Sequence, residues 1–220
     1  MSVVKNIEVK AIHSSLANAF IKKHHYSGKV VPNSQLHFGC YLDDKLHGVM
    51  QFGPSINKKG TINLVKNTKW NEFIELNRMA FDETLPKNSE SRCIGVAIRL
   101  IKKHAPHIKW IISFADATQC GDGTIYRASG FKLVGIAPNT SLRKNPTTGE
   151  NMHVIQAHHK KISKEFRSWQ PLIGNQIKYI YLIDKSMVIN KKVLDFKEID
   201  NLGAGMYKGQ KITLQERKVV

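Results

Sequence analysis

Apolar runs alternate along the chain with stretches whose apolar positions recur at helical spacing, and this alternation predicts the order of strands and helices. Short apolar runs predict strands at Ile7–Ile12, Leu36–Leu42, Leu46–Phe52, Ile74–Phe81, Trp110–Ala115, Phe131–Ala137, Met152–Ala157 and Ile177–Ile183. The second and third strands are separated by only Asp43, Asp44 and Lys45, which predicts a hairpin. Residues 141–149 are polar and indicate a loop.

Helical spacing is clearest in two segments. In the first, Leu16, Ala19 and Phe20 recur behind Ser14 and Ser15, which would cap a helix that stops near Gly28. The second is ended by Pro106, and its apolar stripe consists of Ile94, Ala97, Ile98 and Ile101. The resulting order of elements predicts an α/β (α+β) fold, in which one mixed sheet carries helices on both faces.

The candidate chemistry lies between Ile74 and Phe131, in two units of a strand followed by a helix. The first unit contains R-x-x-G-x-A, formed by Arg92, Gly95 and Ala97 at a helix start. Free backbone N–H groups, the positive helix end and a cation meet there, and these are the groups that hold phosphates or another anionic donor. Ser91 belongs to the same site, unless it is only the helix N-cap. The second unit contains Y-x-x-x-G-F, which begins at Tyr126.

The formal charge of +17, from 34 basic against 17 acidic residues, indicates a polyanionic partner, with nucleic acid as the first candidate. The alternative is a basic protein with no such ligand. No apolar run approaches the roughly 18 residues of a membrane span, and the first ten residues lack a secretory apolar stretch. We therefore expect no membrane partner and a location in the cytoplasm. Three cysteines, Cys40, Cys93 and Cys120, without a C-x-x-C pair argue against a disulfide framework.

The two motifs together resemble the GNAT acyltransferase superfamily, in which the first cradles the donor's pyrophosphate and the tyrosine lies near its thioester. More narrowly, four segments resemble the Mom DNA-modification proteins of Mu-like phages: His25–Gly28, Gly48–Gly53, Asn88–Gly95 and Ser113–Phe131. This resemblance implies a GNAT-like mixed, mostly antiparallel central sheet flanked by helices on both faces. The GNAT-like domain would span residues 1–184, followed by a basic extension at 185–220.

The family resemblance also implies an activity. A Mom-like enzyme converts the exocyclic N6 of adenine in duplex phage DNA to an acetamido (carbamoylmethyl) group, which protects the DNA against restriction. Because N6 is not accessible inside a stacked duplex, the adenine would have to be flipped out. Two alternatives are an ordinary GNAT N-acetyltransferase acting on a protein or small amine, and a DNA-binding module with a decayed acyltransferase core.

Four residues are candidates for catalysis. His25 would be a general base, and Tyr26 would stack on the extruded adenine, the alternative being a helix cap packed on the sheet. Asp116, at the end of a strand, would orient or deprotonate the amine, or else cap a turn. Tyr126 would protonate a leaving group or stabilise an oxyanion, or else belong to the core.

The remaining candidates bind substrates. Arg78 interrupts an apolar strand and would bind an anionic donor together with Ser91, Arg92, Gly95 and Ala97, or else pair with Glu75 or Asp82. Gln51 and Cys120 would line the base pocket, since the amide of Gln51 matches the N6/N7 edge of adenine.

The donor is either an acyl-CoA or a glycyl-tRNA, and the dispersed lysines favour the tRNA. Iron is a further cofactor that the family resemblance raises. However, no H-x-x-x-H or C-x-x-C spacing supports a closed metal site, so we assign no metal ligands.

Overall fold

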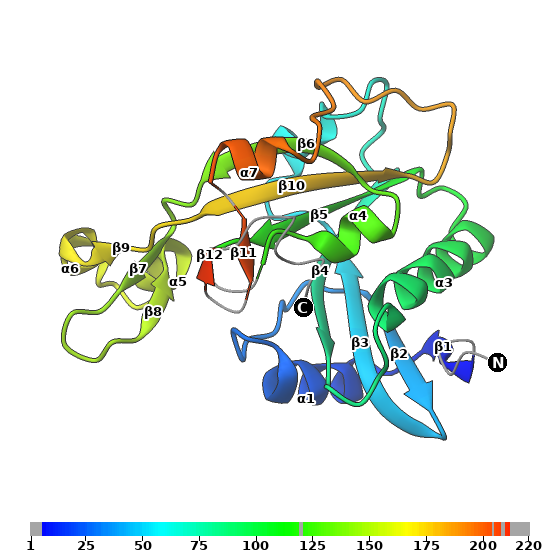
Figure 1. The fold of residues 1–220 in the computed structure, drawn as a ribbon, viewed down its shortest axis with the longest axis horizontal. Helices are drawn as coiled ribbons and strands as arrows, with labels where there is room; N and C mark the ends of the chain where they lie inside the picture. Colours follow the sequence, from blue (N-terminus) through cyan, green and yellow to red (C-terminus); the bar gives the residue numbers. More distant parts are fainter. Residues whose placement is uncertain (1–5, 119–120, 204, 208–209, 212–220) are drawn as a thin grey trace. The chain divides into compact units, whose positions relative to one another are not determined.

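Most of the predicted strands assemble into one seven-stranded sheet in a computed structural model of the chain, which describes residues 6–118, 121–203, 205–207 and 210–211. In spatial order the sheet contains β1 (Glu8–Ala11), β2 (Leu36–Leu42), β3 (Lys45–Gly53), β4 (Phe73–Phe81), β5 (Trp110–Asp116), β10 (Asn175–Leu182) and β6 (Lys132–Pro138). The helices between them are α1 (Ser14–His24), α2 (Lys58–Ile62), α3 (Ser89–His104) and α4 (Thr124–Ala128) (Figure 1).

The sheet is mixed, as predicted. Strands β1 to β4 pair antiparallel, and β5 pairs parallel to β4 after the crossover through α3. At the predicted hairpin, Asp43 and Asp44 both have positive φ, of 49° and 59°. Two such residues produce the tight turn whose twist matches that of the flanking strands.

One face of the sheet is covered by α1. Ala17, Phe20 and Ile21 of this helix pack against Val49 of β3 and Ala80 of β4. Because side chains alternate between the faces of a strand, every second residue of β3 and its register partners point toward α1.

The opposite face carries α3. Gly39 of β2 is the register partner of Val49, which points toward α1, so the next residue, Cys40, points to the other face. There the thiol of Cys40 forms a hydrogen bond with that of Cys93 on α3. The helix exposes Arg99, Lys102 and Lys103 and buries the predicted stripe of Ile94, Ala97, Ile98 and Ile101. Helices therefore lie on both faces, as predicted.

A smaller sheet follows β6 and has the order β8 (Asn151–His153), β7 (Leu142–Lys144) and β9 (Gln170–Pro171). It is accompanied by α5 (Val154–His159) and α6 (Ser163–Ser168). Further along the chain are α7 (Glu198–Asn201) and the paired strands β11 (Met206–Tyr207) and β12 (Gln210–Lys211).

Three local predictions are wrong. The strand predicted over residues 152–157 ends at His153, because His153 and Gln156 form a capping box that starts α5. The predicted polar loop contains β7. At α1 the cap is His13, whose Nδ1 accepts the N–H of Ser15 at 3.2 Å, so neither Ser14 nor Ser15 is the cap.

The contacts divide the chain into two compact units. The first comprises residues 1–114, 123–134 and 178–195, and the second comprises 115–122, 135–177 and 196–220. In the first unit, the segment after β10 packs back on the core: Lys66 N donates to Val188 O, and Asn190 N donates to Leu64 O. The domain division at residue 184 stays a prediction. Within the described ranges, no helix combines the length and apolar character that a membrane span requires.

Candidate active site

The end of α1 holds His25 and Tyr26 in a tight turn of the first unit. The N–H of His25 donates to Ile21 O at 3.0 Å, and Gly28 N donates back to His25 O at 2.8 Å. Gly28 has φ +59°, which a side chain would strain. The rings of His25 and Tyr26 lie 4.2 Å apart, and Tyr26 keeps 49% of its surface exposed. The turn therefore presents an aromatic pair at the surface.

His25 is held in its neutral form. Burial, followed by the nearby charge of Arg78, lowers its pKa to about 4. Its Nδ1 accepts the N–H of Ser27 at 3.1 Å, so the neutral ring carries its proton on Nε2. This geometry makes His25 a hydrogen-bond donor through Nε2 and disfavours the predicted role of general base.

Arg78 lies on the α1 face of β4, close to His25. Its Nε donates to Lys29 O at 3.1 Å, and its Nη1 donates to Asn77 O at 2.8 Å. These contacts connect the strand to the segment that follows α1. The structure thus brings Arg78 together with His25, and the predicted role of Arg78 in donor binding stays a prediction.

Gln51 is the register partner of Arg78 and points to the same face of the sheet. It is 0% exposed, and its Nε2 donates to Asn18 Oδ1 at 2.8 Å and lies 3.1 Å from His37 Nδ1. Its Oε1 is buried without a hydrogen-bond partner among the described residues. A buried acceptor of this kind is uncommon, because leaving it unpaired costs free energy. Because Gln51 is 0% exposed, the protein encloses this acceptor, and the role of Gln51 in a base pocket stays a prediction.

Glu75, also on β4, is a candidate that the sequence reasoning considered only as a partner of Arg78. Burial raises the pKa of its carboxyl, against the opposing influence of Ser55, Asn77 and Arg78. Carboxyls with raised pKa values are suited to accept protons near neutral pH. The same signal that identifies Arg78, a charged residue inside an apolar strand, would have identified Glu75.

Strand β4 leads toward α3 after it parts from β5. In the described residues, the parallel register begins at Phe73 with Trp110 and ends at Glu75 with Ile112. Beyond it, Ser113 Oγ donates to Leu76 O at 3.4 Å. The carboxyl end of a parallel strand is where open sheets place groups that contact ligands.

The predicted donor site is the first turn of α3, where the cap is Asn88, so Ser91 is not the N-cap. Asn88 has φ 73° and makes no side-chain cap hydrogen bond, and Ser91 Oγ donates to Asn88 O at 3.1 Å. Arg92 is half-buried in the same turn, next to the acidic Glu90. The N–H of Ser89 donates to Pro86 O at 3.1 Å and that of Arg92 donates to Asn88 O at 3.2 Å. The positive end of the helix at this turn still suits an anion.

Gly95 and Ala97 differ in what they can do. A Cβ added to Gly95 would meet only Arg99 Nη1, at 3.8 Å, so the space beside its backbone is open. Ala97 is fully buried in the core side of α3 and is positioned for packing rather than for ligand contact.

Tyr126 lies in α4, and its ring packs in the core of the first unit. It is 8% exposed, with ring centroids 5.4 Å from Phe131 and 5.3 Å from Tyr179. Gly123, with φ +80°, precedes the helix, and a Cβ there would come within 2.6 Å of Tyr179. The contacts support the core alternative for the ring, and a role for the hydroxyl stays a prediction.

Asp116 belongs to the second unit. Its Oδ1 accepts a hydrogen bond from the N–H of Thr118 at 3.0 Å and another from the Thr118 hydroxyl. The side-chain amide of Asn139 donates to the same oxygen at 3.1 Å. These contacts support the turn-capping alternative, and its catalytic role stays a prediction. Cys120 lies outside the described residues. Within the described part of the chain, no three His, Cys, Asp or Glu side chains gather to hold a metal ion.

Comparison with known proteins decides the family. The model of the Mom protein family matches residues 6–199. This chain belongs to the Mom protein family. A Mom relative, the methylcarbamoylase mom of Escherichia phage Mu, is 38% identical over 137 residues. That match covers 62% of this chain and 56% of the phage Mu protein, so the chain spans little more than half of that relative's length.

The fold of this Mom-family chain is that of GNAT acetyltransferases. The spermidine/spermine N-acetyltransferase SpeG from Vibrio cholerae superposes with a TM-score of 0.51 at 10% identity. The superposition covers 84% of this chain and 97% of that enzyme. At this identity the likeness concerns the fold alone, and it agrees with the predicted mixed, mostly antiparallel sheet.

Proposed function

We propose that this protein modifies the exocyclic N6 of adenine in duplex DNA to the acetamido (carbamoylmethyl) form, using an activated glycyl or acyl donor. Membership of the Mom family, with the phage Mu methylcarbamoylase as a relative, supports the substrate and the product. The observation that carries the proposal is the polar strip on the α1 face, formed by Gln51, Arg78, His25 and Tyr26.

Each member of the strip has a place in binding a flipped adenine. The exposed ring of Tyr26 stacks on the base, because an aromatic face replaces the neighbouring bases on which the adenine stacks in the duplex. Gln51, fully buried beside Arg78, ties the strip to α1 through its hydrogen bond to Asn18. Glu75, with its raised pKa, is the candidate to accept the proton that N6 releases.

The first turn of α3 holds the anionic part of the donor, through Arg92 and the positive end of the helix, with the open Gly95 one turn further on. Both an acyl-CoA and a glycyl-tRNA are polyanions, and the charge of +17 favours the tRNA.

Attack of N6 on the glycyl ester breaks the ester C–O bond and leaves a glycyl amide on N6, while the tRNA hydroxyl takes the proton. The free glycyl amine then attacks adenine C6 through a five-membered ring. Cleavage of the original C6–N6 bond gives the carbamoylmethyl product.

The test is a reconstitution with purified protein and duplex DNA. With isotopically labelled glycine, glycyl-tRNA synthetase, tRNA and ATP, labelled carbamoylmethyladenine is expected by mass spectrometry of the nucleosides, and RNase treatment should abolish it. Unlabelled product from acetyl-CoA alone would overturn the choice of donor. Acetylation of amines without any DNA product would instead support the ordinary N-acetyltransferase.

A matched pair of variants tests the base-binding strip. Tyr26→Phe keeps the aromatic face and should keep most of the activity, whereas Tyr26→Ala should lose most of it without unfolding, because the side chain is half exposed. Equal activity in both variants would contradict the stacking role.

A further inference from the structure

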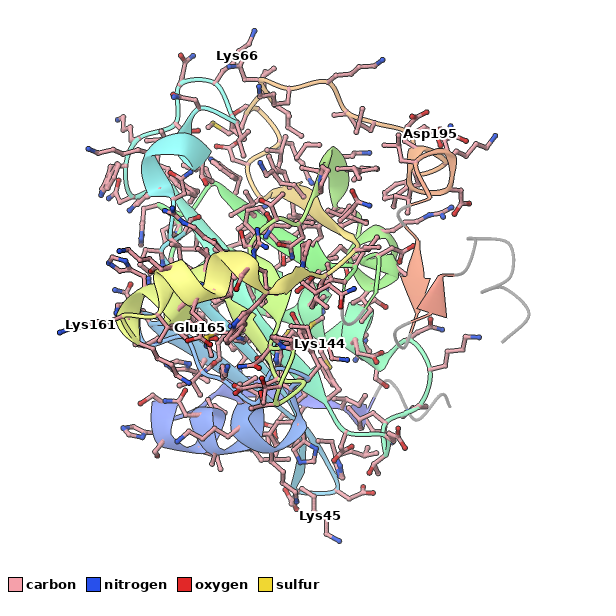
Figure 2. All side chains as sticks on the ribbon, turned by 90° about the vertical axis from the view of Figure 1, so that its left-hand side faces the viewer. Lys45, Lys66, Lys144, Lys161, Glu165 and Asp195 are labelled. Carbon is pink, nitrogen blue, oxygen red and sulfur yellow. The ribbon has the colours of Figure 1, made fainter. Side chains whose placement is uncertain are left out.

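The segment between β6 and β10, residues 139–174, carries a core of its own and none of the predicted site residues. Its small sheet and the helices α5 and α6 enclose a cluster of buried apolar residues, with Met152, Ala157, Phe166 and Trp169 at its centre. The segment also holds six Lys or Arg residues against two acidic ones. Figure 2 shows Lys161 and Glu165 projecting from the α5–α6 region and Lys144 from β7.

A cavity of about 430 Å³ opens in this segment. Val154 and Ile155 of α5 form apolar wall and remain 44% and 42% exposed, although residues of this kind are usually buried. Phe166 of α6 contributes an aromatic surface. The volume falls within the range of small-ligand pockets, and the walls suit a flat apolar group such as a nucleobase.

Two arginines stand at the same cavity. Arg143 is held rigidly: its Nη1 donates to Arg167 O at 3.0 Å and to Trp169 O at 2.7 Å, and its guanidinium lies 5.8 Å from the centre of the Phe166 ring. These bonds use the two hydrogens of Nη1, and Nε and Nη2 carry the remaining N–H donors of the guanidinium. Arg167 is exposed at the edge of the cavity. A fixed guanidinium beside an apolar wall is an arrangement that recognises a phosphate next to a base.

We propose that this cavity binds one unstacked nucleotide of a single-stranded nucleic acid segment, with the base against Val154 and Ile155 and its phosphate at Arg143 and Arg167. A duplex with stacked bases presents no base to such a pocket. Binding of this kind is independent of the reaction proposed above, since it involves none of the residues assigned to that reaction.

The test measures binding of fluorescently labelled six-nucleotide adenine strands, as DNA and as RNA, to the full-length protein. Arg167→Gln and Ile155→Ser should each weaken binding about fivefold or more, the loss expected for one base or one phosphate contact. The matched controls are Lys164→Gln, which removes a charge from the same helix α6, and Ile173→Ser, which changes an apolar residue that is 83% exposed. Neither control residue lines the cavity.

The proposal is supported if binding is lost only in Arg167→Gln and Ile155→Ser. Whichever strand, DNA or RNA, binds more tightly is then the type of nucleic acid that the cavity prefers. Equal losses in Arg167→Gln and Lys164→Gln, with no effect of Ile155→Ser, would reduce the site to nonspecific charge and overturn the proposal. So would equal affinity for blunt duplex and single strand. Thermal melting of each variant confirms that the fold is retained.

Discussion

At the scale of single residues, His25 links protonation to folding. Its folded pKa of about 4 lies below the ordinary value of 6.5, so between these values the unfolded chain binds the proton more readily. Stability is therefore complete above pH 6.5 and is lost as the pH falls toward 4, by at most about 1.4 kcal/mol for each pH unit.

The variant His25→Asn removes this titration while keeping an oxygen where Nδ1 accepts the Ser27 N–H. Its unfolding free energy should depend less on pH between 5 and 7.5 than that of the wild type. His107→Asn, at an exposed position, is the control and should follow the wild type. If His25→Asn retains the wild-type pH dependence, the imidazole is not held neutral by its surroundings.

Apart from the motifs, the sequence indicates candidate residues where their type conflicts with their surroundings. Arg78 was identifiable because a charged residue interrupts an apolar strand, but its contact with Lys29 O joins residues 49 positions apart. The spacing of residues along a strand cannot predict a hydrogen-bond partner that lies so far away in the sequence. The structure places Arg78 near His25, and the assignment of Arg78 to the donor site stays a prediction.

At the scale of elements, the strands were predictable where burial on a central sheet dominates, as in Trp110–Asp116, and failed where a local cap competes with propensity. Val154 and Ile155 are β-branched and favour a strand, but the capping box of His153 and Gln156 satisfies the backbone N–H groups that start a helix. The same two residues remain exposed at the cavity, so burial does not oppose the helix.

Helix α3 offers an element-scale test through Gly95. Alanine in a helix interior is about 1 kcal/mol more favourable than glycine, and no protein atom closer than 3.8 Å opposes the added Cβ. Gly95→Ala should therefore raise the melting temperature and yet weaken binding of coenzyme A or uncharged tRNA, because the methyl group fills the space that the donor needs. Lys103→Ala, on the exposed side of the helix, should leave the binding of coenzyme A unaffected. A variant that is more stable and binds both ligands normally would show that Gly95 has no role in donor binding.

At the scale of the whole molecule, charge is the property that the sequence reveals most directly, and it concerns partners rather than fold. The mixed sheet with helices on both faces follows from the alternation of apolar runs and helical spacing, but its strand order does not, because β10 lies between β5 and β6. The division into two units could not be anticipated either, because each unit is assembled from segments far apart in the sequence. The small sheet of segment 139–174 has strands of two or three residues, too short to leave a periodic signal.

The excess of basic residues gives the last prediction, which concerns duplex DNA. If the charge of +17 serves nucleic-acid binding, the affinity should fall steeply with salt, with a log–log slope of about −0.9 for each phosphate neutralised. Fluorescence anisotropy of a labelled duplex between low and physiological salt measures this slope, and a slope near zero would exclude a phosphate-based interface.

The double variant Lys160→Gln and Lys161→Gln, which changes two exposed residues just after α5, then tests where on the protein the duplex binds. It should reduce the slope by about one to two if the segment 139–174 contacts the duplex backbone. Replacing the exposed Lys102 and Lys103 of α3 is the matched control for an equal loss of charge.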